Sequence, residues 1–227
     1  MEFINKKTKK EADLFLNRLR EKSIPNLFKL PIEEGLCKEG LLCAFQAEVE
    51  RGLHSYLSNG LQAEKIGNVA HWLASHYQKW GLILSGIPGN GKTTTLYAIR
   101  KVINALELQI PNANEGKGVA LLIKTANELC ELMVKDKTTF DNYKTTPLLG
   151  IDEFGIEPEV VYSYGNEFTP ITDILAYRYQ NRLFTILTTN VANSIIRPKY
   201  GDRIAGRMNE MFEIVVMPDV DFRKGII

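Results

Sequence analysis

A glycine-rich segment has the residue types and spacing of a phosphate-binding loop. Residues 86–93 read Gly-Ile-Pro-Gly-Asn-Gly-Lys-Thr and match the pattern G-x-x-x-x-G-K-[ST] in full. Glycines let the main chain curl with its N–H groups pointing inward around a polyphosphate, in dihedral angles that a side chain would forbid. We expect Lys92 to reach the β- and γ-phosphates and the Thr93 hydroxyl to bind Mg²⁺. The residues expected to bind the nucleotide are Gly86, Pro88, Gly89, Asn90, Gly91, Lys92, Thr93 and Thr94.

The residues on either side of this loop support the same interpretation. An apolar run at 82–84 predicts a buried strand that enters the loop, and a helix is predicted to leave it over 93–106. The positive N-terminus of that helix would face the same anion. A glycine-rich turn that matches by chance is the alternative, and the register of strand, loop and helix disfavours it.

Two adjacent acids follow another apolar run, at residues 148–151. The run predicts a buried strand that delivers Asp152 and Glu153 to its C-terminal end, where ligands bind in open α/β sheets. Asp152 is expected to hold Mg²⁺, directly or through water. Glu153 is the candidate base that orients and deprotonates an attacking water. A solvated turn is the alternative for the pair alone.

The apolar run 184–187 ends in the polar residues Thr188, Thr189 and Asn190. The amide of Asn190 could position the lytic water or sense the γ-phosphate. The alternative is that Asn190 caps a helix that begins near Asn193, and both roles could hold together.

Arg203 and Arg207 are four residues apart in a predicted helix, so they share one face. In phosphoryl transfer, an arginine from a neighbouring subunit neutralises transition-state charge and is worth ~10³ to 10⁵ in rate. A solvated basic face is the alternative.

Elements that would position these residues can be predicted from hydrophobic patterning. Short apolar runs without polar alternation, interleaved with helices, predict a parallel sheet covered on both faces. The predicted strands are 82–84, 119–123, 148–151, 184–187 and 213–216, and the predicted helices are 93–106, 127–137, 170–181 and 202–211. Residues 112–118 and 162–167 are the expected surface loops.

The chain before Trp80 is predicted to be helical. An amphipathic stretch surrounds Leu14 and Leu19, and an apolar stripe at helical spacing runs over 42–57. We expect residues 58–60, Ser-Asn-Gly, to close this second helix with a C-terminal glycine. A third helix is predicted over 62–78.

Composition excludes several classes of protein. Lysine plus arginine number 28 and aspartate plus glutamate 27, which excludes a strongly basic nucleic-acid coat but not a local basic patch. Three cysteines without a CxxC pair favour reduced thiols over a disulfide or zinc framework. No apolar stretch approaches the ~18 residues that a membrane-spanning helix needs. We therefore expect a cytoplasmic protein without a membrane partner.

In chain order, these motifs resemble those of a known family of nucleotide hydrolases. Residues 86–94, 148–153, 188–190 and 201–208 resemble the Walker A, Walker B, sensor 1 and box VII segments of AAA+ ATPases. More narrowly, the chain resembles the DnaC/IstB-like family of helicase loaders and transposition helper ATPases. Arg178-Tyr179 and residues 221–223, Asp-Phe-Arg, are also similar to that family. The resemblance covers about residues 66–223.

This resemblance implies a fold and a function. The fold would be an α/β P-loop NTPase of the AAA+ type, with a five-stranded parallel sheet flanked by helices and the phosphate-loop strand between the sensor 1 strand and the last one. The protein would bind and hydrolyse ATP with Mg²⁺ and would form a nucleotide-dependent homo-oligomer on DNA. The DNA is expected to be single-stranded, and the partner would be a replicative helicase or a transposase. Asn190 would be sensor 1, and Arg207 matches the box VII arginine better than Arg203. Residues 1–65 would bind the partner, and residues 66–227 would form the ATPase core.

The chain departs from the family at its C-terminal end. The sequence after the last predicted strand is too short for the helical lid of most AAA+ proteins, so no lid-borne sensor 2 is assigned, and Arg223 is a weak substitute. A P-loop kinase of a small molecule and a nucleotide-switched, non-catalytic DNA adaptor remain alternative functions, although the presence of Glu153 disfavours the adaptor. DNA contacts by residues 6–10, Lys135 or Lys137 are open, because a solvated tail or helix end would look the same.

Overall fold

A parallel sheet forms the centre of the protein. The computed structural model describes residues 9–21, 27–53, 55–56, 59–75, 79–109 and 119–222. The sheet has five strands in the order β2-β3-β6-β1-β7, and every neighbouring pair is parallel. The strands are β1 (Gly81–Ser85), β2 (Leu122–Thr125), β3 (Leu148–Asp152), β6 (Phe184–Thr189) and β7 (Phe212–Val216). The prediction that the phosphate-loop strand lies between the sensor 1 strand and the last strand is confirmed.

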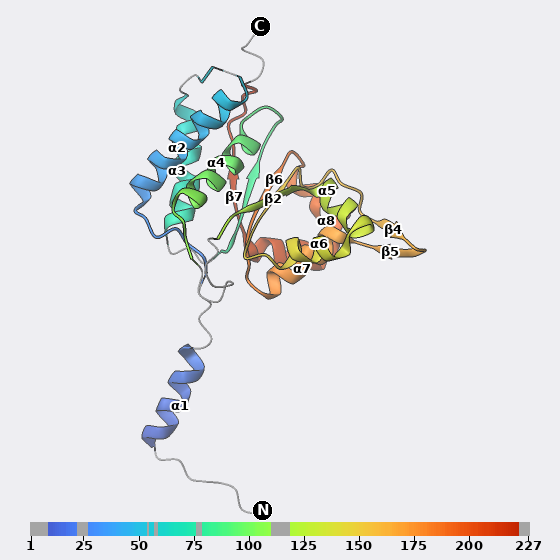
Figure 1. Ribbon diagram of the computed structural model, residues 1–227. Coiled ribbons are helices and arrows are strands. Elements are labelled where there is room, and N and C mark those ends of the chain that lie inside the picture. Colours follow the sequence, from blue (N-terminus) through green and yellow to red (C-terminus); the bar gives the residue numbers. More distant parts are fainter. Residues whose placement is uncertain are drawn as a thin grey trace, which may run out of the picture.

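Helices cover both faces of this sheet (Figure 1). Successive strand residues point to opposite faces, so Leu82 and Leu84 belong to one apolar core and Ile83 to the other. The first core is closed by α2 (Glu34–Arg51), α3 (Gly60–Ala74) and α4 (Lys92–Ala105). The second core is closed by α5 (Ala126–Lys135), α6 (Lys137–Thr145), α7 (Pro170–Gln180) and α8 (Asn193–Met211). The predicted doubly covered parallel sheet is therefore confirmed.

The N-terminal helices differ in their bounds from the prediction. Helix α1 (Lys9–Glu21) is drawn apart from the α/β body in Figure 1 and exposes Leu14, Phe15 and Leu16. The prediction that residues 58–60 close the second helix is wrong. Helix α2 already ends at Arg51, and the Asn59 side chain instead begins α3 by accepting hydrogen bonds from the backbone N–H groups of Leu61 and Gln62. Asparagine is a strong N-cap residue, and this preference outweighs the C-terminal signal of the glycine after it.

Helix α6 and a β-hairpin, both between β2 and α7, were not predicted. Asp136 ends α5 and caps α6, because its carboxylate accepts a hydrogen bond from the Thr139 backbone N–H. The expected surface loop at 162–167 contains a β-hairpin of β4 (Val161–Ser163) and β5 (Asn166–Phe168), which projects from the body in Figure 1. Its two turn residues, Tyr164 and Gly165, both have positive φ, as a tight hairpin turn requires. The other expected loop, 112–118, lies outside the described residues.

Helix α8 is longer than the predicted helix 202–211 and is interrupted. Gly201 has a φ of 80°, so the backbone leaves helical geometry between a first half ending at Tyr200 and a second half beginning at Asp202. The predicted helix corresponds to the second half. Strand β2 starts at Leu122 rather than at residue 119. Within the parts of the chain that the structure describes, no helix combines the length and the apolar character that a bilayer crossing requires.

Candidate nucleotide-binding site

The loop between β1 and α4 curls as the glycine spacing predicts. Gly89 and Gly91 have φ of 81° and 88°, in the left-handed region that side chains disfavour. At Gly89 a Cβ atom would also lie 1.9 Å from the Asp221 Oδ1, so the Asp221 carboxylate would have to move to admit one. Gly91 stands directly before the first turn of α4, whose backbone N–H groups have no carbonyl partner one turn earlier within the helix.

The side chain of Lys92 is buried inside this loop. Its ammonium donates hydrogen bonds to the Gly86 carbonyl at 2.9 Å, the Ile87 carbonyl at 2.6 Å and the Asn90 Oδ1 at 3.0 Å. These acceptors hold the positive charge where the backbone encloses it. The ammonium is therefore already in place to exchange carbonyl oxygens for phosphate oxygens.

Two strands and the start of helix α4 bring polar side chains together at one carboxylate. The Thr93 hydroxyl, at the start of α4, donates to the Asp152 Oδ1 at 3.0 Å, and the Thr188 hydroxyl donates to the same oxygen. Asp152 ends β3 and is buried, and Thr188 lies on the neighbouring strand β6. Mg²⁺ prefers hard oxygen ligands and usually takes one or two from the protein and the rest from phosphates and water. A threonine hydroxyl beside a carboxylate offers two such oxygen ligands.

Glu153 and Asn190 line a cavity that lies beside the phosphate loop. Glu153 is exposed and has a φ of 58°, and its backbone N–H donates to the Thr188 hydroxyl at 3.0 Å. Asn190 follows β6 directly. The alternative role of Asn190 as a helix cap is wrong, because Ala192 occupies the N-cap position of α8 and no side chain caps it. Asn190 therefore lines the cavity and does not cap the helix.

The cavity is bordered on one side by the phosphate loop and on the other by apolar residues that the sequence analysis did not assign to a site. Its volume is about 460 Å³, within the range of small-molecule pockets. The far wall contains Phe45 and Val49 of α2, Tyr56 in the following segment and Phe222 near the C-terminal end. Sequence patterning placed the first three in a core stripe, and Phe45 does belong to the core. Patterning could not show that the same helix also borders a cavity, because that depends on how α2 packs against α4.

Two polar side chains lie in this wall. Burial favours a raised pKa for Glu48, but hydrogen bonds from Lys101 and Arg51 outweigh it and hold the pKa of Glu48 below its usual range. Gln62 is 3% exposed, and neither atom of its amide has a hydrogen-bond partner in the described part of the chain. An unpaired donor and acceptor are costly to bury, so this amide fits a wall that receives a polar ligand such as a nucleoside.

The segment after β7 crosses the phosphate loop. The Met217 N–H donates to the Ser85 carbonyl at 2.8 Å, and the Phe222 N–H donates to the Gly89 carbonyl at 3.1 Å. Between them, the Asn90 amide donates to the Pro218 carbonyl at 3.2 Å. The predicted substitute for sensor 2, Arg223, lies outside the described residues.

Arg203 and Arg207 are not brought to this cavity within one copy of the chain. Both lie on the second half of α8 and neither lines the cavity. Arg203 is exposed. The Arg207 guanidinium lies 5.0 Å above the ring of Tyr179, whose hydroxyl donates to Glu210 at 2.6 Å. A role in nucleotide hydrolysis for either arginine therefore requires the site of another copy.

Arg178, which the sequence linked to the family, has a different place. Its side chain is fully buried and contacts no carboxylate in the described residues. The guanidinium donates to the Thr185 hydroxyl at 2.8 Å and to the carbonyls of Thr146 and Phe184 at 2.8 and 2.6 Å. It therefore joins the end of α6 to the start of β6, far along the strand from the cavity.

The similarity of the chain to known proteins lies in its three-dimensional structure. No protein-family model matches the chain, and no curated protein matches it. A crystal structure of the DnaC helicase loader is similar, with 23% identity, a TM-score of 0.54 and coverage of 72% of this chain and 93% of that one. A crystal structure of DnaI is also similar, with 20% identity, a TM-score of 0.53 and coverage of 72% of this chain and 88% of that one. At these identities the similarity concerns the fold. Its sheet order, its phosphate loop and these neighbours together show that the chain has an α/β P-loop fold, similar to the folds of the DnaC helicase loader and DnaI.

Proposed function

We propose that the protein is a Mg²⁺-dependent ATPase of DNA replication, which loads or remodels a replicative helicase as an oligomer on DNA in the cytoplasm. The observation that carries the ATPase assignment is the meeting of Thr93, Asp152 and Glu153 beside the loop that encloses Lys92. Each of these residue types is needed for phosphoryl transfer to water. Thr93, Glu153 and Lys92 line one cavity large enough for a nucleotide, and Asp152 is hydrogen-bonded to Thr93 at its edge.

In this proposal, each side chain has a separate task. Lys92 and the backbone N–H groups at the start of α4 bind the phosphates. Thr93 and Asp152 would hold Mg²⁺, which would supply positive charge to neutralise the phosphates. Glu153 accepts the proton of the attacking water, and Asn190 orients that water or the terminal phosphate. The apolar wall around Phe45 and Tyr56 receives the base.

Two observations support an oligomer that acts on a partner. Arg203 and Arg207 lie outside the cavity of their own copy, which is where an arginine that completes a neighbouring site would have to lie. Helix α1 exposes three consecutive large apolar residues, as a helix that docks on another protein does. The helicase itself, and single-stranded DNA as the track, are proposed from the similarity to the DnaC helicase loader. A transposase is the alternative partner.

A small-molecule kinase and a non-catalytic adaptor are the competing functions. The kinase would use the same loop and Mg²⁺, but Glu153 would then have no water to activate, and a phosphorylated acceptor would appear in place of free phosphate. The adaptor would bind ATP without turnover, so Glu153→Gln would release as little phosphate as the wild type.

Phosphate release separates these functions in one assay. We expect wild-type protein with ATP and Mg²⁺ to release inorganic phosphate, Lys92→Ala to bind no nucleotide, and Glu153→Gln to bind ATP without releasing phosphate. Affinity capture with Glu153→Gln and ATP, compared with Lys92→Ala under the same conditions, would then identify the partner. A wild-type protein that binds ATP but releases no phosphate, alone or with DNA, would refute the ATPase assignment.

A further inference from the structure

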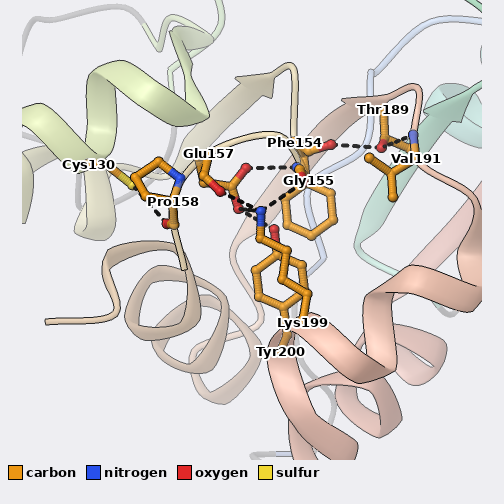
Figure 2. Close-up of polar contacts among 9 residues, drawn as sticks. All are labelled: Cys130, Phe154, Gly155, Glu157, Pro158, Thr189, Val191, Lys199 and Tyr200. Atoms are coloured by element: carbon orange, nitrogen blue, oxygen red, sulfur yellow. Dashed lines mark hydrogen bonds and ion pairs between the residues drawn. The ribbon is translucent and has the colours of Figure 1, made fainter. Parts of the chain in front are cut away.

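A buried polar cluster lies beside Phe154 and Gly155, the two residues that follow Glu153 in the chain (Figure 2). Its centre is the carboxyl group of Glu157, a residue that is only 3% exposed. The carboxylate accepts a hydrogen bond from the Gly155 N–H at 2.8 Å and another from the Tyr200 hydroxyl. The Lys199 ammonium lies 3.5 Å from the same carboxylate. Glu157 is on the loop after β3, and its two partners are on α8, so the cluster joins two elements of the fold.

The cluster completes the hydrogen bonds of the turn. Sensor strand β6 holds the first two residues, because Thr188 accepts from the N–H groups of Glu153 and Phe154, and the Thr189 hydroxyl donates to the Phe154 carbonyl at 2.7 Å. The third residue, Gly155, has other partners for its backbone groups. Its N–H donates to Glu157 and its carbonyl accepts from Lys199 at 2.7 Å.

An aromatic contact adds to these hydrogen bonds. The ring of Tyr200 is stacked on that of Phe154, with centroids 5.0 Å apart and planes 13° from parallel. Both rings are buried, and Figure 2 shows the stack below the Gly155 backbone. Burial, together with the hydrogen bond to Glu157, raises the pKa of Tyr200, so its hydroxyl remains a donor. The turn is thus held from β6 on one side and from α8 on the other.

We propose that Glu157, Lys199 and Tyr200 form a clamp that positions Glu153 for its reaction with water. The proposal rests on the ATPase function proposed above. Glu153 has a positive φ, and a non-glycine residue stays in that region only when its surroundings impose it. Without the clamp, the N–H and the carbonyl of Gly155 lose their hydrogen-bond partners, and the backbone of the turn can relax. The three residues are positioning residues, since none of them lines the cavity.

The expected effect follows from the geometry of general-base catalysis. A base must lie within hydrogen-bond reach of the proton it removes, and a displacement of about 1 Å can cost ~100-fold in rate. Nucleotide binding depends on other atoms, those of the phosphate loop. Loss of the clamp should therefore lower kcat and leave the affinity for ATP unchanged. A cluster that only stabilised the fold would change neither quantity in protein that remains folded.

Two mild substitutions test the clamp in the full chain. Tyr200→Phe keeps the stacked ring and removes the hydroxyl, and Lys199→Met keeps most of the side-chain stem and removes the charge. Their matched controls are Tyr162→Phe, whose hydroxyl contacts Glu167 on the exposed hairpin, and Lys65→Met on α3. We expect kcat to fall by ~10- to 100-fold in the clamp variants, with KM for ATP within about twofold of wild type, and no change in the controls. In the background of Glu153→Gln, the same substitutions should cause no further loss.

Amide hydrogen exchange tests the clamp without any need for turnover. In the clamp variants, the amides of residues 153–155 should exchange faster than in wild type, while those of the phosphate loop should not. Unchanged exchange at these amides would overturn the proposal, and so would faster exchange with an unchanged kcat. If the wild-type protein released no phosphate, the ATPase assignment would fail, whereas the exchange rates would still decide whether the clamp holds the turn.

Discussion

Thr93 and Asp152 are separated by 59 positions in the sequence, and yet the Thr93 hydroxyl donates a hydrogen bond to the Asp152 Oδ1 at 3.0 Å. The strands that lead to them, β1 and β3, are not neighbours, because β6 lies between them. Thr188 of β6 donates to the same oxygen and so fills the gap. The start of α4 and the strands β3 and β6 therefore meet at one carboxylate oxygen, which is the place where we expect Mg²⁺.

Removal of the Thr93 hydroxyl should weaken binding of the metal with the nucleotide. We expect Thr93→Val to lower the affinity for ATP in the presence of Mg²⁺ by ~10- to 100-fold, the effect that follows when a metal site loses an oriented group. Isothermal titration with Mg²⁺ and again with EDTA measures this difference. Thr138→Val, at an exposed position of α6, is the control. Equal affinities of wild type and Thr93→Val under both conditions would contradict the assignment.

Glu153→Gln should separate binding from turnover. The amide cannot accept the proton of water, so phosphate release should fall by ~10² to 10⁴, while ATP stays bound. Quenched-flow assay of phosphate and filter binding of labelled ATP give the two quantities. Glu131→Gln, at an exposed acid of α5 that pairs with Lys135, should behave as wild type. A Glu153→Gln variant that turns over at the wild-type rate would remove Glu153 from the mechanism.

Arg207→Ala should bind ATP normally and lose hydrolysis, by ~10³ or more if the guanidinium completes the site of another copy. Mixing this variant with Lys92→Ala should then restore part of the activity, since each supplies what the other lacks. Arg203→Ala in the same assay shows which arginine acts. Arg197→Ala, which removes an exposed partner of Asp202 on the same helix, is the control. Full activity of Arg207→Ala and Arg203→Ala alone would end the shared-site model.

Two N-terminal truncations test the boundary between the partner-binding segment and the ATPase core, which remains a prediction. Helix α2 contributes Cys37, Leu41 and Phe45 to the core under α4 and lines the cavity. Removal of residues 1–26 should therefore leave ATP affinity and the melting temperature unchanged. Removal of residues 1–65 should abolish both ATP binding and cooperative unfolding, as followed by circular dichroism. A shorter fragment that still melts cooperatively and binds ATP would support the boundary at residue 65.

Arg178→Met should destabilise the fold without touching the cavity. The substitution leaves buried carbonyls at the end of α6 and the start of β6 without their donor, at a cost of about 1–3 kcal/mol for each unpaired group. We expect the urea midpoint to fall while ATP affinity stays the same at low temperature. Arg182→Met, at an exposed position near Trp80, should leave the midpoint unchanged. An unaltered midpoint for Arg178→Met would show that water replaces the guanidinium.

Local patterns were sufficient to predict the sheet and the phosphate loop. Apolar runs without polar alternation identified the buried strands. The glycine spacing before Lys92 identified the phosphate loop, because glycines allow the backbone to curl around a polyphosphate. The wall formed by Phe45 and Tyr56 was missed, because an apolar stripe has the same spacing whether it meets a core or borders a cavity. Glu157 and Tyr200 were missed for a related reason, since their contact spans 43 positions and no local pattern encodes it.

Gly201 divides helix α8 into two halves that carry different groups of residues. The turn before it supplies Lys199 and Tyr200 to the cluster beside Gly155, and the turns after it carry Arg203 and Arg207. If the proposed oligomer forms, a change of the backbone dihedral angles at Gly201 would shift Arg203 and Arg207 toward or away from another copy and leave Lys199 and Tyr200 in place. A residue with a side chain would strain the backbone at this positive φ and so restrict that independence.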